Sequence, residues 1–278
     1  MIDAHQHFWR LSRGDYAWPN ETVAPIFRDF APDDLEPLLA EADIRQTVLV
    51  QANDTVAETH FILDIAKKTP WVAAVVGWVD LKSADAIATI DGLKRNPKLK
   101  GLRPMLQNIT DTDWILDPAA APAIAHMEAA GLCFDALIQP RHLGAIAELA
   151  RRYPSLPVVI DHIAKPKMGG GLNPDKSWAK GMSDLATLPN VWCKLSGMIT
   201  EIGRGWHESD LEPFARSILS AFGTRRVMWG SDWPVVNLAG DYMSWLNAAQ
   251  GLSAHLSESD RTLIFDKNAR SFYGIESE

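Results

Sequence analysis

Short apolar segments alternate with amphipathic ones along almost the whole chain, and this order restricts the folds that the chain can adopt. The amphipathic segments are rich in helix formers, and one of them opens with the capping-box residues Thr55 and Glu58. The apolar segments have the length and residue types of strands, and there are eight of them: Met1–Phe8, Gln46–Gln51, Val72–Asp80, Leu99–Arg103, Leu132–Ile138, Pro157–His162, Val191–Ser196 and Val227–Asp232.

Eight strands separated by eight helical segments predict an α/β protein, a (β/α)8 TIM barrel that forms a single domain over residues 1–278. No glycine-rich dinucleotide motif follows the first strand, so a doubly wound sheet is not favoured. Helices are expected at Asp33–Ala42, Thr55–Lys68, Ala84–Arg95, Pro118–Ala130, His142–Tyr153, Lys176–Thr187 and Glu208–Phe222, followed by two more at Tyr242–Ala249 and Glu258–Lys267.

Charge and composition argue against several classes of partner. The net charge of −8 and the lack of any basic cluster are not typical of proteins that bind nucleic acid or an anionic membrane. No apolar run approaches the roughly 18 residues of a membrane span, and no signal peptide is evident, so we expect a cytoplasmic protein. Cys133 and Cys193 lie in expected strands, where we expect buried free thiols rather than a disulfide.

Polar and charged side chains gather at the C-terminal ends of the expected strands. In a barrel these ends converge on one cavity, which is where barrel enzymes place their chemistry. His5 and His7 lie two residues apart at the first exit, and side chains two apart on a strand point to the same side. The other exits offer Gln51, Asn53, Trp78, Arg103, Asp135, His162, Lys165, Lys194, Asp232 and Trp233.

The histidines and the last carboxylate are the candidate catalytic residues. A lone histidine is more often structural than functional, but His5 and His7 together with His162 reverse that expectation. Asp161 alternates away from His162 along the strand, so we expect a structural role for it. Asp232 fits a helix cap, yet beside several imidazoles a carboxylate would accept a proton from attacking water, and we favour this role.

Several other exit residues suit substrate recognition. Arg103 fits either a buried ion pair or a substrate contact, whereas Lys194 and Glu201 are expected to pair with each other. Four tryptophans individually suit packing, but as a group they would form an apolar wall against a sugar ring: Trp9, Trp18, Trp78 and Trp233. The expected substrate-binding residues are Gln51, Asn53, Trp78, Arg103, Lys165 and Trp233.

The motifs at these exits resemble the amidohydrolase superfamily, in its amidohydrolase family 2. The resemblance runs from residue 1 to Tyr273 and is carried by Asp3-Ala-His-Gln-His-Phe-Trp9, Gly77-Trp-Val-Asp-Leu81, Lys100-Gly-Leu-Arg-Pro-Met-Leu106, Val159-Ile-Asp-His-Ile-Ala-Lys-Pro166, Lys194-Leu-Ser-Gly197 and Trp229-Gly-Ser-Asp-Trp-Pro234. These segments are similar to the sugar-lactonase branch, including L-fuconolactonases and L-rhamnono-lactonases. The resemblance implies that His5 and His7 are the strand-one metal or substrate histidines, that His162 is the strand-six histidine, and that Asp232 activates water.

Two departures from the superfamily pattern bear on the metal content. Binuclear members carry a carboxylated lysine or a glutamate at the end of strand four, where this chain has Arg103, and strand five ends without a histidine. A cationic arginine would repel a metal, so no binuclear centre is expected. Two possibilities stay open: one Zn²⁺ bound by His5, His7 and Asp232, or metal-independent catalysis in which histidines and cations polarise the carbonyl.

The resemblance implies hydrolysis of a small-molecule sugar lactone, an aldonolactone such as L-fuconolactone, to its aldonic acid. One alternative is a 2-pyrone-4,6-dicarboxylate-type lactonase, for which Arg103, Lys165 and Arg141 would supply the cations. A second is a metal-dependent decarboxylase of the same superfamily. A third is a barrel that binds a sugar acid as a sensor without turnover.

Overall fold

Eight parallel strands, hydrogen-bonded in chain order, form the centre of the computed structural model, which describes residues 1–276. Each strand ends one to three residues before its predicted end, because the chain leaves the sheet just where the polar exit residues begin. The strands are β1 (Ile2–Gln6), β2 (Gln46–Val50), β3 (Val72–Gly77), β4 (Leu99–Leu102), β5 (Cys133–Ala136), β6 (Val158–Ile160), β7 (Val191–Leu195) and β8 (Val227–Trp229).

The sheet closes because the segment after β8 pairs with the end of β1. The backbone amide of Asp232 donates to the carbonyl of His5 over 2.8 Å, and the amide of His7 donates to the carbonyl of Trp233 over 2.7 Å. Residues at the two ends of the chain are thereby neighbours. The predicted (β/α)8 TIM barrel is confirmed.

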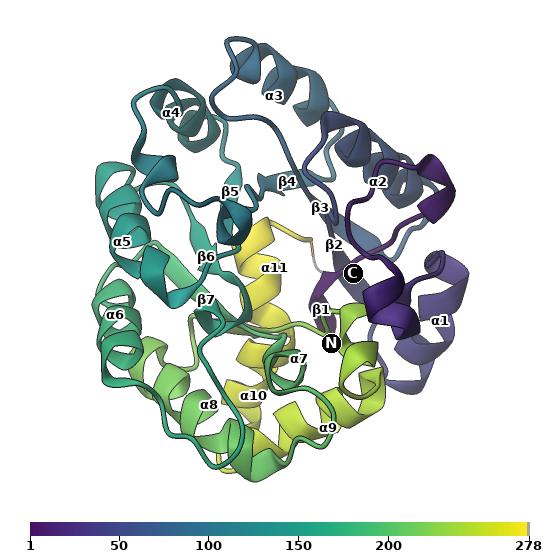
Figure 1. Ribbon diagram of the computed structural model, residues 1–278, viewed down its shortest axis with the longest axis vertical. Coiled ribbons are helices and arrows are strands. Elements are labelled where there is room, and N and C mark those ends of the chain that lie inside the picture. Colours follow the sequence, from purple (N-terminus) through teal and green to yellow (C-terminus); the bar gives the residue numbers. More distant parts are fainter. Residues whose placement is uncertain (277–278) are drawn as a thin grey trace.

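Helices surround the barrel in chain order, as Figure 1 shows. The helix α8 has its predicted bounds, and the others agree to within a few residues. They are α1 (Pro32–Glu41), α2 (Val56–Lys68), α3 (Ala86–Lys94), α4 (Ala121–Ala129), α5 (Leu143–Arg152), α6 (Lys176–Ala186), α8 (Glu208–Phe222) and α9 (Tyr242–Leu252).

The C-terminal segment differs from the prediction. The single helix expected at Glu258–Lys267 is α10 (Glu258–Thr262) followed by a π-helical turn, Leu263–Lys267, and the chain then continues into α11 (Asn268–Tyr273). The short α7 (Met198–Ile202) after β7 was not predicted either. No helix among residues 1–276 is long and apolar enough to cross a bilayer.

Two apolar layers hold the barrel together. The larger lies between the strands and the surrounding helices. The smaller fills the barrel interior, where strand residues such as Ile2, Val48 and Val159 meet Phe272 and Tyr273 of α11. Helix α11 therefore packs against the barrel interior together with the strands, and the ionisable interior residues lie above this apolar layer.

Both cysteines are buried free thiols, as predicted. Burial raises the pKa of the Cys133 thiol and of the Cys193 thiol well above the usual cysteine value. Since the thiolate is the reactive form, the native protein should not react with an aromatic disulfide reagent, whereas the denatured protein should release two equivalents. Rapid labelling of either thiol in the native state would contradict this packing.

Candidate active site

Four side chains from β1, the end of β6 and the end of β8 meet at the C-terminal end of the barrel. The Asp232 Oδ1 atom lies 3.7 Å from His5 Nε2, 3.3 Å from His7 Nε2 and 3.8 Å from His162 Nε2. All four residues are buried, and each imidazole presents a ring nitrogen to the same carboxylate oxygen. The predicted catalytic residues are thus brought together, although their roles stay a prediction.

The backbone that presents two of these residues is left-handed. Asp232 has a φ of 57°, and the four consecutive residues His162 to Lys165 have φ between 49° and 62°. For residues with a Cβ this conformation costs about 1–2 kcal/mol each, and such strain is concentrated at functional sites. The indole of Trp178 donates to the carbonyl of Ile163 over 2.9 Å and helps to hold the turn.

Burial and the neighbouring charges determine the protonation states of Asp232, His162 and His5. Burial alone would raise the pKa of Asp232, but the neighbouring imidazoles, His162 first among them, hold it below its usual value. Burial lowers the pKa of His162 to about 4 despite the nearby carboxylates. Burial, together with the charge on Lys194, lowers the pKa of His5 well below its usual value. At neutral pH the cluster therefore holds an ionised Asp232 beside neutral His5 and His162.

Gly197 lies directly against the imidazole ring of His162 and leaves space for it. Gly197 has a φ of +64°, and a Cβ at this position would lie 2.7 Å from His162 Cγ. We expect Gly197→Ala to displace the ring and lower kcat/KM about 100-fold, the effect of a misplacement of about 1 Å. The control is Gly131→Ala, which has a φ of +68° but open space around its Cβ. Equal activity losses in the two variants would show that backbone strain, not His162, is responsible.

A buried charge network lies directly under His5. Lys194 Nζ is 2.6 Å from Asp135 Oδ2, 3.0 Å from Asp161 Oδ1 and 3.1 Å from His5 Nδ1. The predicted pairing of Lys194 with Glu201 is therefore wrong, because β7 directs Lys194 into the barrel. Glu201 instead pairs with Lys165 over 3.2 Å.

The neighbours stabilise the charges of Lys194 and Asp161, whereas burial raises the pKa of Asp135 although Lys194 opposes it. Burial would lower the pKa of Lys194, but Asp135 and Asp161 raise it. Burial would raise the pKa of Asp161, but Lys194, followed by His5 and Arg103, holds it well below the usual value. Asp161 also contacts Arg103, whose Nη1 atom lies 3.2 Å from its Oδ2 atom, and the structural role expected for Asp161 stays a prediction.

Arg103 joins the network to the cavity. Its guanidinium donates to the side-chain and backbone oxygens of Gln51, and Nη1 lies 3.3 Å from His5 Nε2. It also lines a cavity of about 400 Å³ above the cluster. Both roles considered for Arg103, a buried ion pair and a surface that a substrate could touch, are compatible with this position.

Both polar and apolar side chains line the cavity. The polar ones include His7, His162 and Asp232 together with Asn53 and Lys165. Ala17, Trp18, Met105, Leu137, Val235 and Leu238 line the apolar part.

The predicted recognition residues divide into two groups. Asn53, Arg103 and Lys165 line the cavity. Gln51 is buried behind Arg103 and holds it, whereas Trp78 and Trp233 are not among the cavity-lining residues of the described chain. Trp233 packs instead against Phe8 and Phe30, and the backbone of Trp78 is bound by the Thr59 hydroxyl.

Two cavity residues lie beyond the strand exits: Trp18, which belongs to the tryptophans expected to form an apolar wall, and Thr200, which the prediction missed. Trp18, 38% exposed, belongs to the long segment after β1, and Thr200 belongs to α7. The Thr200 hydroxyl oxygen is buried and has no hydrogen-bond partner among the described residues. A Trp-rich segment at the catalytic end of a barrel was the available signal for Trp18, and no signal marked Thr200.

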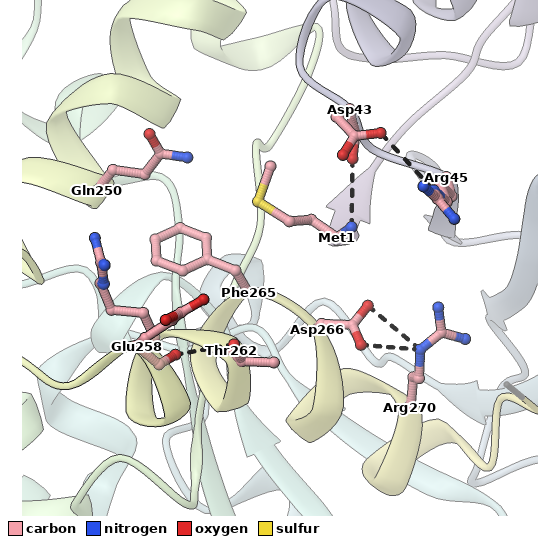
Figure 2. Close-up of a pocket in the computed structure, with 10 residues that line it drawn as sticks. Met1, Asp43, Arg45, Gln250, Glu258, Thr262, Phe265, Asp266 and Arg270 are labelled. Atoms are coloured by element: carbon pink, nitrogen blue, oxygen red, sulfur yellow. Dashed lines mark hydrogen bonds and ion pairs between the residues drawn. The ribbon is translucent and has the colours of Figure 1, made fainter.

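The volume of a cavity does not by itself identify the candidate active site. Figure 2 shows another hollow, of about 520 Å³, near the amino ends of β1 and β2. Several of its polar groups are paired with one another: Arg270 pairs with Asp266 over 3.2 Å, and the Met1 ammonium donates to the Asp43 carbonyl over 3.3 Å. The amino end of a barrel contributes stability rather than chemistry, so the smaller cavity above the histidines is the candidate site.

Two groups of buried side chains could hold a metal ion: His5 with His7 and Asp232, and His5 with Asp161 and His162. In the first group the His5 and His7 Nε2 atoms are 3.1 Å apart, and they lie 3.7 Å and 3.3 Å from Asp232 Oδ1. Tetrahedral zinc with ligands at about 2.0–2.1 Å places neighbouring ligand atoms roughly 3.3 Å apart. The donor atoms of this group therefore fit one zinc ion.

Comparison with known proteins decides the family. The family model described as amidohydrolase matches residues 2–275. The chain belongs to the amidohydrolase family. An L-fucono-1,5-lactonase of Burkholderia ambifaria is 50% identical over 99% of this chain and 96% of the relative.

Solved structures of amidohydrolases agree with this assignment. A crystal structure of an amidohydrolase from Burkholderia multivorans with bound HEPES is 33% identical, with a TM-score of 0.93 over 99% of both chains. A second crystal form, with bound zinc, is 34% identical with a TM-score of 0.91 over 99% of both chains. The resemblance expected from the motifs is thus confirmed at the level of family and fold.

Proposed function

We propose that this amidohydrolase is a sugar lactonase that opens an aldonolactone, such as L-fucono-1,5-lactone, to its aldonic acid. The observation that carries the proposal is the convergence of Asp232 with His5, His7 and His162 at the floor of a cavity. The 50% identical relative, named L-fucono-1,5-lactonase, supports the choice of substrate class. One catalytic domain would span the chain, and a cytoplasmic location stays a prediction.

The chemistry follows from the charges at the site. Asp232 is ionised, so it can accept a proton from a water molecule as the water oxygen attacks the lactone carbonyl carbon. Negative charge then develops on the carbonyl oxygen, and the Arg103 guanidinium and the imidazole N–H groups stabilise it. The bond between the carbonyl carbon and the ring oxygen breaks, and Asp232 returns the proton to that oxygen. The products balance: lactone and water give one hydroxy acid.

The cavity wall suits a polyol with an apolar face. Asn53 and Lys165 line the cavity and offer hydrogen bonds for substrate hydroxyl groups. Trp18 lines the same cavity and offers an aromatic face. Trp78 and Trp233, proposed from the sequence for this role, lie outside the lining and would act through packing.

One zinc ion would bind at the catalytic cluster. His5, His7 and Asp232 would hold the ion, as their spacing fits and as the zinc-bound relative suggests. When bound, zinc would act as a Lewis acid on the carbonyl oxygen. Arg103 stands where binuclear enzymes have a bridging ligand, so we propose at most one ion.

A dicarboxylate lactonase ranks second, because it would need several convergent cations. The Arg141 side chain donates to the carbonyl oxygens of Thr110 and Ile109, and Lys165 is engaged by Glu201. Of the three cations considered for this role, Arg103 is the one that contacts the histidine cluster, and it is already paired with Asp161.

A substrate panel separates the candidate functions. Purified protein is assayed with L-fucono-, L-galactono-, L-rhamnono- and D-arabinono-lactones and with 2-pyrone-4,6-dicarboxylate, using a pH indicator, and with 2,6-dihydroxybenzoate, using carbon dioxide release. We expect acid release from one or more aldonolactones and no carbon dioxide. Turnover confined to the dicarboxylate, or carbon dioxide without acid, would refute the proposal.

A further inference from the structure

One buried carboxylate lies outside the catalytic cluster and has no role in the proposed reaction. Glu58, in the first turn of α2, is fully buried. Its Oε1 atom accepts a hydrogen bond from the backbone amide of Ala52 over 3.1 Å. Its Oε2 atom accepts from the Tyr16 hydroxyl over 2.6 Å and from the Arg13 guanidinium. Burying a charge is costly unless it is paired and hydrogen-bonded, so these three donors allow the carboxylate to be buried.

The hydroxyl and guanidinium donors come from the segment that follows β1. Tyr16 directly precedes Ala17 and Trp18, and both of these residues line the cavity above the histidines. Arg13 also donates to the Tyr16 hydroxyl oxygen over 3.1 Å, so the two donors to Glu58 hold each other. Glu58 therefore fixes the position of the chain just before the aromatic residue of the cavity wall.

Arg13 links the same segment to α2 in a second way. Its guanidinium carbon lies 4.4 Å from the centre of the Phe61 ring of α2 and 5.3 Å from the centre of the Tyr16 ring. The guanidinium also pairs with Asp15 over 2.5 Å. Because Asp15 is partly exposed, Arg13 keeps an anionic partner next to water when the charge of Glu58 is removed.

The third donor belongs to the segment that follows β2. Ala52, Asn53 and Asp54 are consecutive residues of the cavity wall, and the Ala52 amide is the one bound by Glu58. The side-chain amide of Asn53 donates to the backbone carbonyl of Asp15 over 2.8 Å. The segments after β1 and β2 are thus joined twice, directly through Asn53 and indirectly through Glu58.

We propose that Glu58 is a positioning residue for substrate binding, which holds these two segments in the arrangement that presents Trp18 and Asn53 to the cavity. Without the carboxylate the segments would adopt other conformations as well, and only a fraction of the molecules would have a complete cavity wall. The apparent affinity for a ligand falls in proportion to that fraction. The kinetic part of this inference rests on the proposed lactonase function.

Glu58→Gln should raise KM for an aldonolactone about tenfold and leave kcat within about twofold. The amide keeps an acceptor for one of the donors but offers no charge to Arg13. Asp232 and His162 belong to the segments after β8 and β6, so a bound substrate meets the same catalytic cluster. A loss of binding that substrate and transition state share changes KM and not kcat. An unchanged KM, or a fall in kcat as large as the rise in KM, would overturn the proposal.

Two control variants separate this effect from the loss of a charge and from the loss of stability. Asp64→Asn removes an exposed carboxylate from the same helix and should leave KM unchanged. Lys98→Met removes hydrogen bonds to three backbone carbonyls at the amino end of the barrel, so it should lower the melting temperature without raising KM. A tenfold higher KM in either control would mean that Glu58→Gln acts through general damage, and the proposal would be wrong.

The position of the wall can be followed without any substrate. Protein labelled with 5-fluorotryptophan gives a fluorine NMR signal for Trp18, assigned from a Trp18→Phe variant. In Glu58→Gln this signal should shift and broaden, because the indole samples more than one environment. The signals of Trp178 and Trp245, which are buried in the core and are assigned in the same way, should not change. A Trp18 signal that is identical in the wild type and in Glu58→Gln would overturn the proposal.

Tyr16→Phe is the second variant should Glu58→Gln fail to fold. It removes the hydroxyl that lies between Glu58 and Arg13 and leaves every charge in place. KM should rise about threefold, with a smaller shift of the same fluorine signal. No change in either measurement would contradict the positioning role.

The two measurements distinguish the failure of this inference from the failure of the proposed function. A wild type without lactonase activity refutes the proposed function, and the fluorine measurement still tests the role of Glu58. A wild type that opens lactones, together with a Glu58→Gln variant of the same KM and the same Trp18 signal, refutes the inference alone.

Discussion

Asp232→Asn should lower kcat for lactone opening by about 10³-fold or more while the barrel stays folded. General acid–base catalysis contributes roughly 10²–10⁴-fold, and an amide cannot accept the proton of the attacking water. The amide is isosteric with the carboxylate, so the contacts of Oδ1 with His5, His7 and His162 keep similar distances. The comparison is made from initial rates on one aldonolactone, with circular dichroism as the check on folding.

The matched control for this variant is Asp117→Asn. Asp117 is a solvent-facing residue that pairs with Lys82 over 2.6 Å and does not line the cavity above the cluster. Its replacement should leave kcat within about twofold of the wild type. An Asp232→Asn enzyme within tenfold of the wild type would rule out Asp232 as the base.

Arg103→Lys should lower kcat/KM by about 10²-fold, the size of effect seen when one donor to a developing oxyanion is lost. A lysine keeps the positive charge but not the planar fork, which contacts Gln51, Asp161 and His5 at once. Because the charge opposite Asp161 is kept, the variant should fold, and a thermal melt verifies this.

Arg141→Lys is the control for the loss of a guanidinium at the rim. Arg141 donates to backbone carbonyls outside the catalytic cluster, so its replacement should affect kcat/KM little. If Arg103→Lys retained full kcat/KM, Arg103 would have only its structural role, and the oxyanion would depend on the imidazoles alone.

The alternation of strand and helix segments was sufficient to predict the barrel, because eight such repeats have few other ways to bury their apolar faces. The same alternation predicted where the candidate catalytic residues meet. His5, His7, His162 and Asp232 each follow or end a strand, and parallel strands bring those ends to one side.

The wrong predictions have physical causes. Lys194 was expected to pair with Glu201 because the two are close in sequence, but the alternation along β7 turns Lys194 into the barrel, where two carboxylates from β5 and β6 meet it. Trp78 was expected to face the cavity, but the chain leaves β3 before it, at Gly77.

The backbone conformation of the segments after the strands could not be predicted from the residue pattern. The four left-handed residues from His162 to Lys165 carry no glycine that would announce them. Trp18 and Thr200 enter the cavity from segments whose course depends on contacts with the rest of the barrel. The cavity residues contributed by these segments are consequently the part of the site that needed coordinates, whereas Asn53, Arg103 and Lys165 were predicted from the sequence.

The most direct measurement is acid release from L-fucono-1,5-lactone by the purified wild-type protein, corrected for spontaneous opening in buffer. The account predicts saturable turnover with kcat/KM of about 10⁴ M⁻¹s⁻¹ or higher, in the range of ordinary enzymes on their own substrates. A rate that does not exceed the buffer rate for this lactone, and equally for its L-galactono, L-rhamnono and D-arabinono counterparts, would contradict it.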